Sequence, residues 1–494
     1  MNKPPRHVLS KSTFMSGMQC EKKLFLGKYH RNLRDDISAA QQAIFSQGTS
    51  VGELACQLFP GGVDCTPESY YDFQKAVVKT QECIDAGETI IYEAAFQFDG
   101  VLAAMDMLVK TNDGWRAYEV KSSTSVSDTY RMDGTLQYYV ITNSGIPLKD
   151  ISIVYINNQY VKNGEIDVHQ LFTIESIKEA VQERLANIPI DIARFKKLLS
   201  DKIEPEIEIG THCSTPYGCD FKGHCWKHVP KYSVFDIKYA KGIDWKLYNE
   251  GYLTTKEIPD DYKLNERHQI QVSGDKTGES IINKKNIRSF LDQLNYPLYH
   301  LDFETFGSAV PVYDNSRPYQ QLVFQYSLHK QETIDSEYEH FEFLAETNNK
   351  DPRPDLIKQM IKDCETNGDI LTYNIGFERG KINDLAKQFP EFAEPLHKLI
   401  DRLKDLMLPF QQKWYYTPDM QGSYSIKKVL PALVPELNYN ELKIQEGNTA
   451  SNTFAQMAQG NFIGDVTQTR KELLEYCKMD TWAMVKILER LYLV

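Results

Sequence analysis

Three cysteines, Cys213, Cys219 and Cys225, lie close together near the middle of the chain. Proline and glycine interrupt this stretch, which is typical of a loop shaped around a bound group rather than of a helix or strand. A soft metal centre prefers thiolate ligands and commonly takes four of them. Cys20, far upstream, is the best candidate for the fourth ligand. These four residues predict a 4Fe–4S cluster that ties both ends of one domain together.

Zinc is the alternative for this set, with His212, His224 or His228 as candidate nitrogen donors. Structural zinc sites usually pair cysteines two to four residues apart. Here five residues separate each clustered cysteine from the next, which favours the iron–sulfur cluster. Reduced thiols without a shared ligand are the third interpretation, although a Gly/Pro-rich loop is a poor place for them.

A second group of reactive side chains lies in a stretch that predicts a hairpin turning near Asp99–Gly100 and a third strand over 115–121. Side chains alternate along a strand, so Glu119 and Lys121 point to the same face. If Asp106 lies on the neighbouring strand, two carboxylates and one ammonium converge. Such a set would hold Mg²⁺ or Mn²⁺ for phosphodiester cleavage, with Lys121 steadying the developing charge. The acid–x–lysine pattern alone is also common on sheet edges.

A third group begins with Asp302 and Glu304, which share one face of a strand rich in apolar residues. Two acids on the same side of a core strand repel each other unless a cation lies between them. Further strands are expected near 321–329 and 337–344. Three more chemically capable side chains follow on expected helices: Glu378, Tyr476 and Asp480.

Length and composition set the limits within which these groups act. A chain of 494 residues with 41% hydrophobic content is expected to form two to four domains with full-sized cores. No apolar run approaches the roughly 20 residues that span a bilayer, and the N-terminus lacks the apolar region of a secretory signal. Nine mostly unclustered cysteines suit a reducing compartment, so a cytoplasmic location is expected.

The charge distribution bears on the expected substrate. The net charge of −12 argues against a passive nucleic-acid coat, but metal ions reverse the local sign at acidic sites. From Lys3 to Arg34 there are eight Lys or Arg residues and one acid, Glu21. This basic segment is either a phosphate-contacting surface or an ordinary solvated face.

Several elements must position these side chains. The pattern predicts helices over Ser10–Leu26, over 40–59 with Glu53 on it, and over about 70–86. A helix after the third strand would carry Asp133 and Gln137 on one face, because they are four residues apart. Residues 151–157 predict a buried strand with a structural role.

Asp106, the Glu119–Lys121 strand, the helix after it and the bracketing cysteines together resemble the RecB-type branch of PD-(D/E)XK nucleases. The likeness is to its iron–sulfur exonucleases, such as AddB and the CRISPR-adaptation nuclease, and it spans about residues 8–228. It implies that Asp106 and Glu119 bind metal and that Lys121 is the catalytic lysine. It also implies a cluster held by Cys20 and the three later cysteines.

Two features depart from that family. Its helical histidine or acid should fall on the 40–59 helix, where Glu53 is the natural occupant and no histidine occurs. Its glutamine followed four residues later by tyrosine is altered, because Gln137 is present but Ile141 stands at the tyrosine position. Gln137 is therefore kept as a site residue and the tyrosine is left unassigned.

The later groups, in their order along the chain, resemble the DEDD exonucleases of the DnaQ type, over about residues 295–494. The resemblance implies that Asp302, Glu304 and Asp480 hold two metal ions and that Tyr476 orients the attacking water. The second motif departs from the family, since Glu378 stands where aspartate is usual. Two fallback carboxylates, whose spacing fits less well, are Asp384 and Asp405.

The expected architecture is therefore α/β with two domains. A RecB-like PD-(D/E)XK restriction-endonuclease-like domain closed by the cysteine cluster would cover 1–228, a helical linker without chemistry 229–290, and an RNase H-like DEDD domain 291–494. This pairing resembles a bacterial protein family of undefined function.

The expected function is a Mg²⁺- or Mn²⁺-dependent exonuclease acting on DNA single strands or ends, in repair, recombination or defence against foreign DNA. One alternative is a nucleic-acid-binding iron–sulfur module in which only the DEDD site cuts, or neither does. The others are an RNA substrate and a redox-responsive scaffold.

Overall fold

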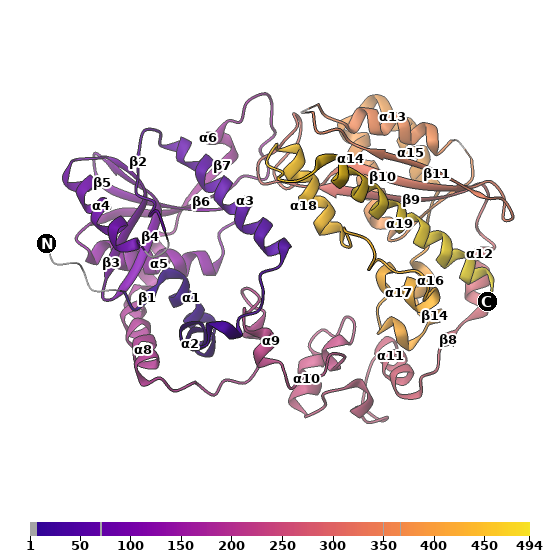
Figure 1. The fold of residues 1–494 in the computed structure, drawn as a ribbon, viewed down its shortest axis with the longest axis horizontal. Helices are drawn as coiled ribbons and strands as arrows, with labels where there is room; N and C mark the ends of the chain where they lie inside the picture. The colour runs from indigo at the N-terminus through magenta and orange to yellow at the C-terminus, as the bar shows by residue number, and fades with distance from the viewer. Residues whose placement is uncertain (1–6, 70–71, 349, 366) are drawn as a thin grey trace. The chain divides into compact units, whose positions relative to one another are not determined.

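The computed structural model describes residues 7–69, 72–348, 350–365 and 367–494. The chain forms two compact units, which are treated separately below (Figure 1). The first unit extends to His228 and also includes Ala309–Pro311 and Arg317–Tyr319, whereas the second contains the remainder from Val229 onward. Both units combine sheets with helices, so the protein is α/β, as the sequence predicts.

The first unit is built on a sheet that has seven strands within the described ranges, in the order β2-β3-β4-β5-β6-β7, with β1 beside the start of β4. Neighbouring strands from β3 to β5 are antiparallel, whereas β5 and β6 are parallel. The hairpin expected at Asp99–Gly100 and the third strand are confirmed. The strands are β1 (Leu9–Ser10), β2 (Val63–Asp64), β3 (Ile90–Phe98), β4 (Val101–Thr111), β5 (Gly114–Lys121), β6 (Leu148–Ile156) and β7 (Phe172–Ser176).

Helices cover both faces of this sheet. The larger core joins one face to α1, α4, α5 and α8, and a smaller core joins the other face to α3 and α6. The helix expected over 70–86 corresponds to α4, and residues 70 and 71 lie outside the described ranges. Lys3 and Arg6 of the basic N-terminal segment also lie outside them. The helices are α1 (Lys11–Gln19), α2 (Glu21–Tyr29), α3 (Ala39–Ala55), α4 (Phe73–Asp85), α5 (Asp128–Asn143), α6 (Val168–Leu171), α7 (Lys178–Arg184), α8 (Ile188–Asp201) and α9 (Lys222–Cys225).

The prediction of a single helix from Ser10 to Leu26 is wrong, because the helix is interrupted at Cys20. Ser10 caps α1 as expected, but Cys20 has an extended backbone (φ −164°, ψ 122°) and separates α1 from α2. The amide of Gln19 donates hydrogen bonds to the carbonyl oxygens of His212 (2.8 Å) and Tyr217 (2.7 Å). These hydrogen bonds join residues far apart in the chain and accompany the break. The local sequence predicts a helix but carries no information about such long-range bonds.

The second unit contains a sheet whose described strands run in the order β11-β10-β9-β12-β13. Strands β9, β10 and β11 are antiparallel to their neighbours, and β12 and β13 run parallel to β9. The strands expected near 321–329 and 337–344 are confirmed as β10 and β11. The bounds are β9 (Leu298–Phe306), β10 (Leu322–Gln331), β11 (Tyr338–Leu344), β12 (Asp369–Thr372) and β13 (Leu403–Asp405).

Two hydrophobic cores attach helices to the faces of this second sheet. One core packs α13 (Arg353–Asp363), α14 (Ile375–Gln388) and α15 (Ala393–Asp401) on one face. The other core packs a further set of helices on the opposite face. These are α12 (Lys284–Leu291), α16 (Leu408–Gln411), α17 (Ile426–Leu433), α18 (Gly447–Ala458) and α19 (Val466–Tyr492).

Residues 229–290, expected to form a helical linker, belong to the second unit. They contain α10 (Ile243–Asn249) and α11 (Glu266–Thr277), with a small apolar cluster of their own. Their short strand β8 (Ile281–Ile282) pairs with β14 (Tyr415–Tyr416). None of the helices in the described ranges combines the length and apolar character needed to cross a bilayer.

Candidate metal centres

Three carboxylates converge in the second unit. Strand β9 presents Asp302 and Glu304 two residues apart, and helix α19 packs on β9 and brings in Asp480. One oxygen from each of the three lies within 4.8 Å of the others. Across the described ranges, no other group of three His, Cys, Asp or Glu ligand atoms meets this spacing. Carboxylate oxygens at this spacing are suitable ligands for Mg²⁺ or Mn²⁺.

The electrostatics of this group favour a bound cation. Burial, then the charges of Asp480 and Glu304, raise the pKa of Asp302 well above its ordinary value. Burial and Asp480 likewise raise the pKa of Glu304. Burial raises the pKa of Asp480 to about 6, against the opposing hydrogen bond from Tyr439 and charge of Lys427. A divalent cation would replace the protons that hold these acids together.

Glu378 is a fourth acid whose charge acts on this group, although it is not one of the three acids within 4.8 Å of one another. It lies on α14, is only 2% exposed, and its Oε2 has no hydrogen-bond partner among the described residues. Burial, then Asp405, raise its pKa to about 8. Its charge also contributes to the raised pKa of Asp302, so the two side chains are electrostatic neighbours. A buried, unsatisfied carboxylate oxygen calls for an explanation, and a ligand is a simple one.

The two fallback acids are engaged elsewhere. Asp384 forms an ion pair with Lys381 (2.9 Å) and its side chain is 46% exposed. Asp405 accepts hydrogen bonds from the backbone N–H groups of Asn374 (3.1 Å) and Met407 (2.9 Å). Both carboxylates therefore have local structural partners that Glu378 lacks.

Tyr476 lies beside the carboxylates, together with two residues that the sequence analysis missed. The ammonium group of Lys427 donates to the Tyr476 hydroxyl (3.2 Å) and lies 5.2 Å from its ring centroid. The Tyr439 hydroxyl donates to Asp480 Oδ1 (2.6 Å). Burial and the charge of Asp480 raise the pKa of Tyr476, so its hydroxyl keeps its proton. Lys427 lies on α17 and Tyr439 in the irregular segment that follows, and no local spacing connects either residue to Asp480 or Tyr476.

In the first unit, β5 positions Glu119 and Lys121 as expected, but Glu119 already has partners on both oxygens. Its Oε1 accepts from Lys11 (2.6 Å) and Lys121 (2.8 Å), and its Oε2 from Gln137 on α5 (2.5 Å). The side chain is only 2% exposed. Although burial opposes ionisation, Lys11 and Lys121 outweigh it and lower the pKa of Glu119 to about 2.

Asp106 lies on β4, next to Glu119 of the neighbouring strand β5. The pairing of β4 with β3 is interrupted at Asp106. The register between β3 and β4 skips Asp106 and Glu93, and Glu93 has a left-handed backbone (φ 51°). Asp106 Oδ2 accepts a hydrogen bond from the N–H of Val120 (2.5 Å). Burial, then Glu119, raise the pKa of Asp106 to about 7. One acid of the pair is thus held charged while the other tends to keep a proton.

These side chains line one cavity of about 870 Å³ in the first unit. Exposed Glu53 lines it from α3, and Tyr130 lines it with its ring centroid 5.1 Å from the Lys121 ammonium. Ile141, at the position where the related family has tyrosine, is buried in the core, so it has a packing role. The other lining residues include Asp64, Glu93, Asp106, Glu119 and Lys121.

The sequence analysis missed Lys11 as a member of this group and did not assign Asp133 to it. Lys121 forms an ion pair with Asp133 (3.0 Å), which shares a face of α5 with Gln137. The four-residue spacing of Asp133 and Gln137 already placed them on one helix face. This spacing is the sequence feature that could have identified Asp133 as a member of the group. Lys11 is 108 residues from Glu119 in the chain, and no local pattern connects them.

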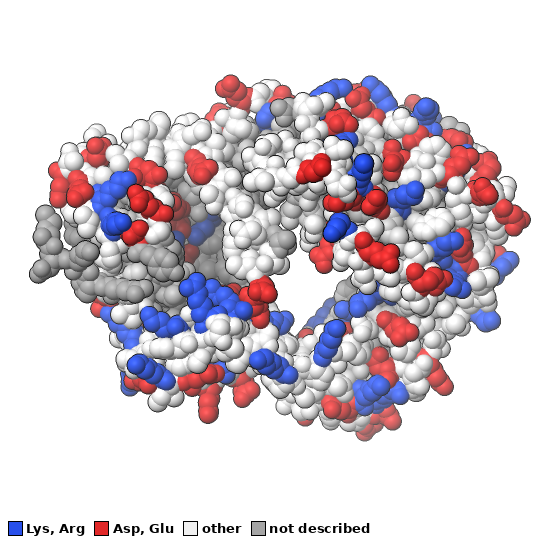
Figure 2. Space-filling model, in the orientation of Figure 1, with Lys and Arg blue, Asp and Glu red and all other residues white. Residues whose placement is uncertain are grey.

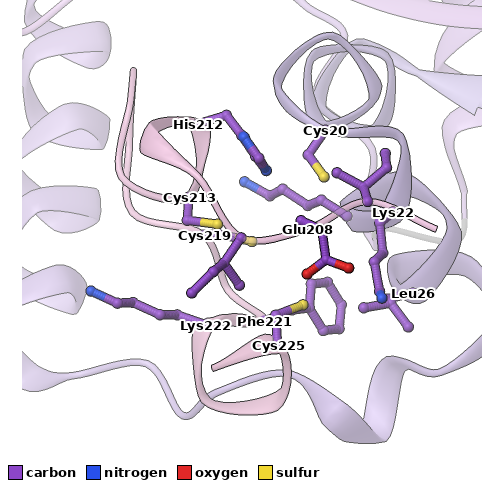
Figure 3. Close-up of a pocket in the computed structure, with 13 residues that line it drawn as sticks. Cys20, Lys22, Leu26, Glu208, His212, Cys213, Cys219, Phe221, Lys222 and Cys225 are labelled. Atoms are coloured by element: carbon purple, nitrogen blue, oxygen red, sulfur yellow. The ribbon is translucent and has the colours of Figure 1, made fainter. Parts of the chain in front are cut away.

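The four cysteines Cys20, Cys213, Cys219 and Cys225 line a common cavity (Figure 3). All four are free thiols. Backbone hydrogen bonds link Asp35 to Asp220 and Cys219 to Cys213, so the N-terminal segment and the cysteine loop are joined directly. Phe25, Leu26 and Phe221 pack beside the cysteines as a small apolar cluster. The cavity also contains His212 and Glu208 among its lining residues.

The spacing of these thiols bears on which group they fit. Four thiolates around one zinc ion, with bonds of about 2.3 Å, would be only about 4 Å apart. Within the described ranges, the thiols do not form a group as compact as the three carboxylates. Burial raises the pKa of Cys225 and of Cys219, while Lys22 and Lys23 respectively oppose the rise.

Comparison with known proteins finds relatives but no established activity. A family described as "Domain of unknown function (DUF2779)" matches residues 299–425, a range that contains Asp302, Glu304 and Glu378 but not Asp480. "Uncharacterized protein MG366 homolog" of Mycoplasma pneumoniae is 28% identical over 271 residues, covering 50% of this chain and 40% of that protein.

Two further relatives have similar standing. "Uncharacterized protein MG366" of Mycoplasma genitalium is 24% identical over 299 residues, covering 52% of this chain and 43% of its own length. "Uncharacterized protein UU173" of Ureaplasma parvum serovar 3 is 27% identical over 218 residues, covering 38% of this chain and 30% of that protein. The matches thus cover less than half of each relative's length.

Proposed function

We propose that this protein is a Mg²⁺- or Mn²⁺-dependent nuclease that hydrolyses phosphodiester bonds at DNA single strands or ends. The observation that carries the proposal is the convergence of Asp302, Glu304 and Asp480 within 4.8 Å, where Glu304 and Asp480 are buried and Asp302 is partly exposed. The strand order β11-β10-β9-β12-β13, with the first three antiparallel, supports an RNase H-like exonuclease of the DnaQ type.

When bound, cations at these carboxylates would polarise the phosphate and lower the pKa of the attacking water. The protein's own contribution is to hold the ligands in place before the substrate arrives. Tyr439 fixes the rotamer of Asp480, and Lys427 holds the Tyr476 hydroxyl at the edge of the group. Tyr476, which keeps its proton, would orient a water by hydrogen bonding without removing its proton.

The first unit would supply a second nuclease site of the RecB-like PD-(D/E)XK type. Asp106 and Glu119 are the metal ligands in this proposal, Lys121 stabilises developing negative charge, and Gln137 orients Glu119. Glu53 lines the same cavity and would be a further carboxylate available to the metal. Lys and Arg side chains gather over α2 and the segment that follows it, which favours contact with phosphates (Figure 2).

A 4Fe–4S cluster on Cys20, Cys213, Cys219 and Cys225 would have a structural role in this unit. Held by these residues, the cluster would link the junction of α1 and α2 to the segment from Cys213 to the end of α9, closing a segment of roughly 200 residues. The cluster would also keep these four thiols ionised.

A second function is favoured by one observation: both oxygens of Glu119 are occupied by side chains of the protein itself. A carboxylate already neutralised by two lysines binds a metal less readily. The first unit would then grip nucleic acid, and only the second unit would cut it.

The test uses end-labelled single strands of DNA and RNA, each labelled at either end, with Mg²⁺, Mn²⁺ or EDTA. Asp302→Asn is expected to lower cleavage by the second unit about a hundredfold or more. Exposed Asp335→Asn serves as the matched control. The proposal is overturned if neither metal supports cleavage of any substrate, or if Asp302→Asn combined with Asp106→Asn leaves cleavage unchanged.

A further inference from the structure

A third cavity, of about 350 Å³, lies within the second unit. It is bordered by the segment before α10, the start of α11 and the chain around β14, a region expected to carry no chemistry. This volume is within the usual range for a small-molecule site. Its charged lining side chains are Lys238, Lys241, Arg267, Lys413 and one acid, Glu266. Four cations and one acid form a strongly positive lining in a chain whose net charge is −12.

Two aromatic rings stand beside these cations. Tyr239 and Tyr424 are stacked, with centroids 5.7 Å apart and planes 13° apart, and their hydroxyl groups are hydrogen-bonded to each other. Tyr239 is 62% exposed, so most of its surface is accessible. An aromatic face next to positive charge is the arrangement by which proteins hold a nucleic-acid base and its phosphate.

The backbone around this cavity is strained. Tyr239, Lys241 and Lys413 all have left-handed backbones, with φ of 56°, 48° and 57°. Within the described ranges eleven non-glycine residues have positive φ, and three of them line this cavity. Side chains other than glycine rarely adopt this conformation, and such strain tends to collect at ligand sites.

Buried hydrogen bonds hold this strained wall in place. Gln271 on α11 is 2% exposed; its Oε1 accepts from the N–H of Lys238 (3.2 Å) and its Nε2 donates to the carbonyl of Asp236 (3.1 Å). His268 adds a bond to the carbonyl of Lys238 (3.2 Å). The cavity wall is therefore organised before any ligand binds, which lowers the entropy cost of binding.

Within the described ranges, none of the four cations of the cavity forms an ion pair with an acid, and Lys413 donates to the carbonyl of Gly422 (2.7 Å). Lys413 is only 8% exposed, and burial, then Arg267, lower its pKa to about 8, although Asp275 opposes the shift. Asn265 caps α11 and lines the cavity with Arg267, so the positive end of a twelve-residue helix also faces it.

We propose that this cavity binds one nucleoside phosphate, with the base against Tyr239 and the phosphate among Lys238, Arg267 and Lys413. The ligand is either a free nucleotide or the terminal unit of a single strand, which present the same chemistry. The inference goes beyond cleavage, since it uses no residue of either carboxylate site.

The experiment is calorimetric titration of the full chain in EDTA, which removes divalent cations and prevents cleavage. The probes are thymidine monophosphate, inorganic phosphate and a 5′-phosphorylated tetrathymidylate. Lys238→Ala and Arg267→Ala are each expected to weaken nucleotide binding about tenfold. Tyr239→Ala is expected to weaken it about tenfold through lost stacking, whereas Tyr239→Phe keeps the ring and most of the affinity. Exposed Lys263→Ala, outside the cavity, is the matched control.

Each outcome decides the matter. Variant-sensitive binding of the mononucleotide supports a free nucleotide, whereas sensitivity confined to the tetrathymidylate supports a strand end. The proposal is overturned if all variants bind every probe as the unmodified chain does. It is also overturned if inorganic phosphate binds as tightly as the nucleotide, because the tyrosine then contributes nothing.

Discussion

Lys11 and Glu119, 108 residues apart in the chain, form an ion pair of 2.6 Å at the interior strand β5 of the first unit's sheet. Lys121 shares the same oxygen of Glu119, so two ammonium groups compensate one buried carboxylate. Without a metal, this arrangement keeps Glu119 ionised and oriented.

Lys11→Met is therefore expected to lower the melting temperature by about 2–4 °C in EDTA, because Glu119 loses one of its two cations. Mn²⁺ should restore the lost stability by occupying the vacated side of the carboxylate. Differential scanning fluorimetry measures both effects, and Lys28→Met, at an exposed position on α2, is the control. An identical loss with and without Mn²⁺ would count against metal binding at Glu119.

Lys121→Ala and Asp106→Asn should each abolish the cleavage that remains once Asp302→Asn has disabled the second unit. Lys121 stabilises developing charge in the proposed reaction, and Asp106 supplies a metal ligand. The assay is degradation of end-labelled strands, with circular dichroism to verify folding. Exposed Lys110→Ala on β4 provides the control. Full activity in both variants would leave the first unit as a binding module.

Cys20→Ser should remove iron and destabilise the first unit, since Cys20 closes the long segment that the cluster spans. Anaerobically purified protein is expected to be brown and to contain about four irons per chain. Iron analysis and visible absorption measure this, and Cys56→Ser, which lies in a different cavity, should keep the iron. Stoichiometric zinc without visible absorption would refute the cluster.

Glu378→Gln should lose most of the activity of the second unit, as Asp302→Asn does, since both remove a carboxylate of the proposed metal site. The activity of Glu378→Asp should lie between that of Glu378→Gln and that of the native chain, because shortening the side chain by one methylene displaces the ligand by about 1 Å. Asp384→Asn, on the same helix but paired with Lys381, is the control and should stay active. If Asp384→Asn were inactive and Glu378→Gln active, Asp384 rather than Glu378 would be the metal ligand.

In EDTA, the free energy of unfolding should fall as the pH rises from about 5 to 8. The folded pKa values of Asp480 and Glu378 are raised to about 6 and about 8, above the ordinary 3.8 and 4.5. The folded state therefore binds more protons than the unfolded chain in this range, and removing protons favours unfolding. Mg²⁺ should reverse the loss by replacing those protons.

Thermal melts across this pH range, with EDTA or Mg²⁺, measure the effect. Asp480→Asn should flatten the EDTA curve, because asparagine does not titrate. A melting temperature that rises with pH in EDTA would show that the four acids are compensated within the protein.

The local sequence was sufficient to recognise which side chains share a face. Asp302 and Glu304, like Glu119 and Lys121, are two residues apart on strands, and backbone geometry places such pairs on one side. The helix spacing of Asp133 and Gln137 is fixed in the same way. The α/β class followed from these two periodicities, since each is set within a few residues.

Only the tertiary structure decided which faces meet. Asp480 reaches β9 because α19 packs on the sheet, and Lys11 reaches Glu119 because α1 does so in the first unit. The break at Cys20 and the compact fold of residues 229–290 were likewise absent from the local pattern. The physical reason is that periodicity encodes the direction of a side chain along its own element. The partner across the core depends on packing and hydrogen bonds between distant segments, which no single stretch of sequence contains.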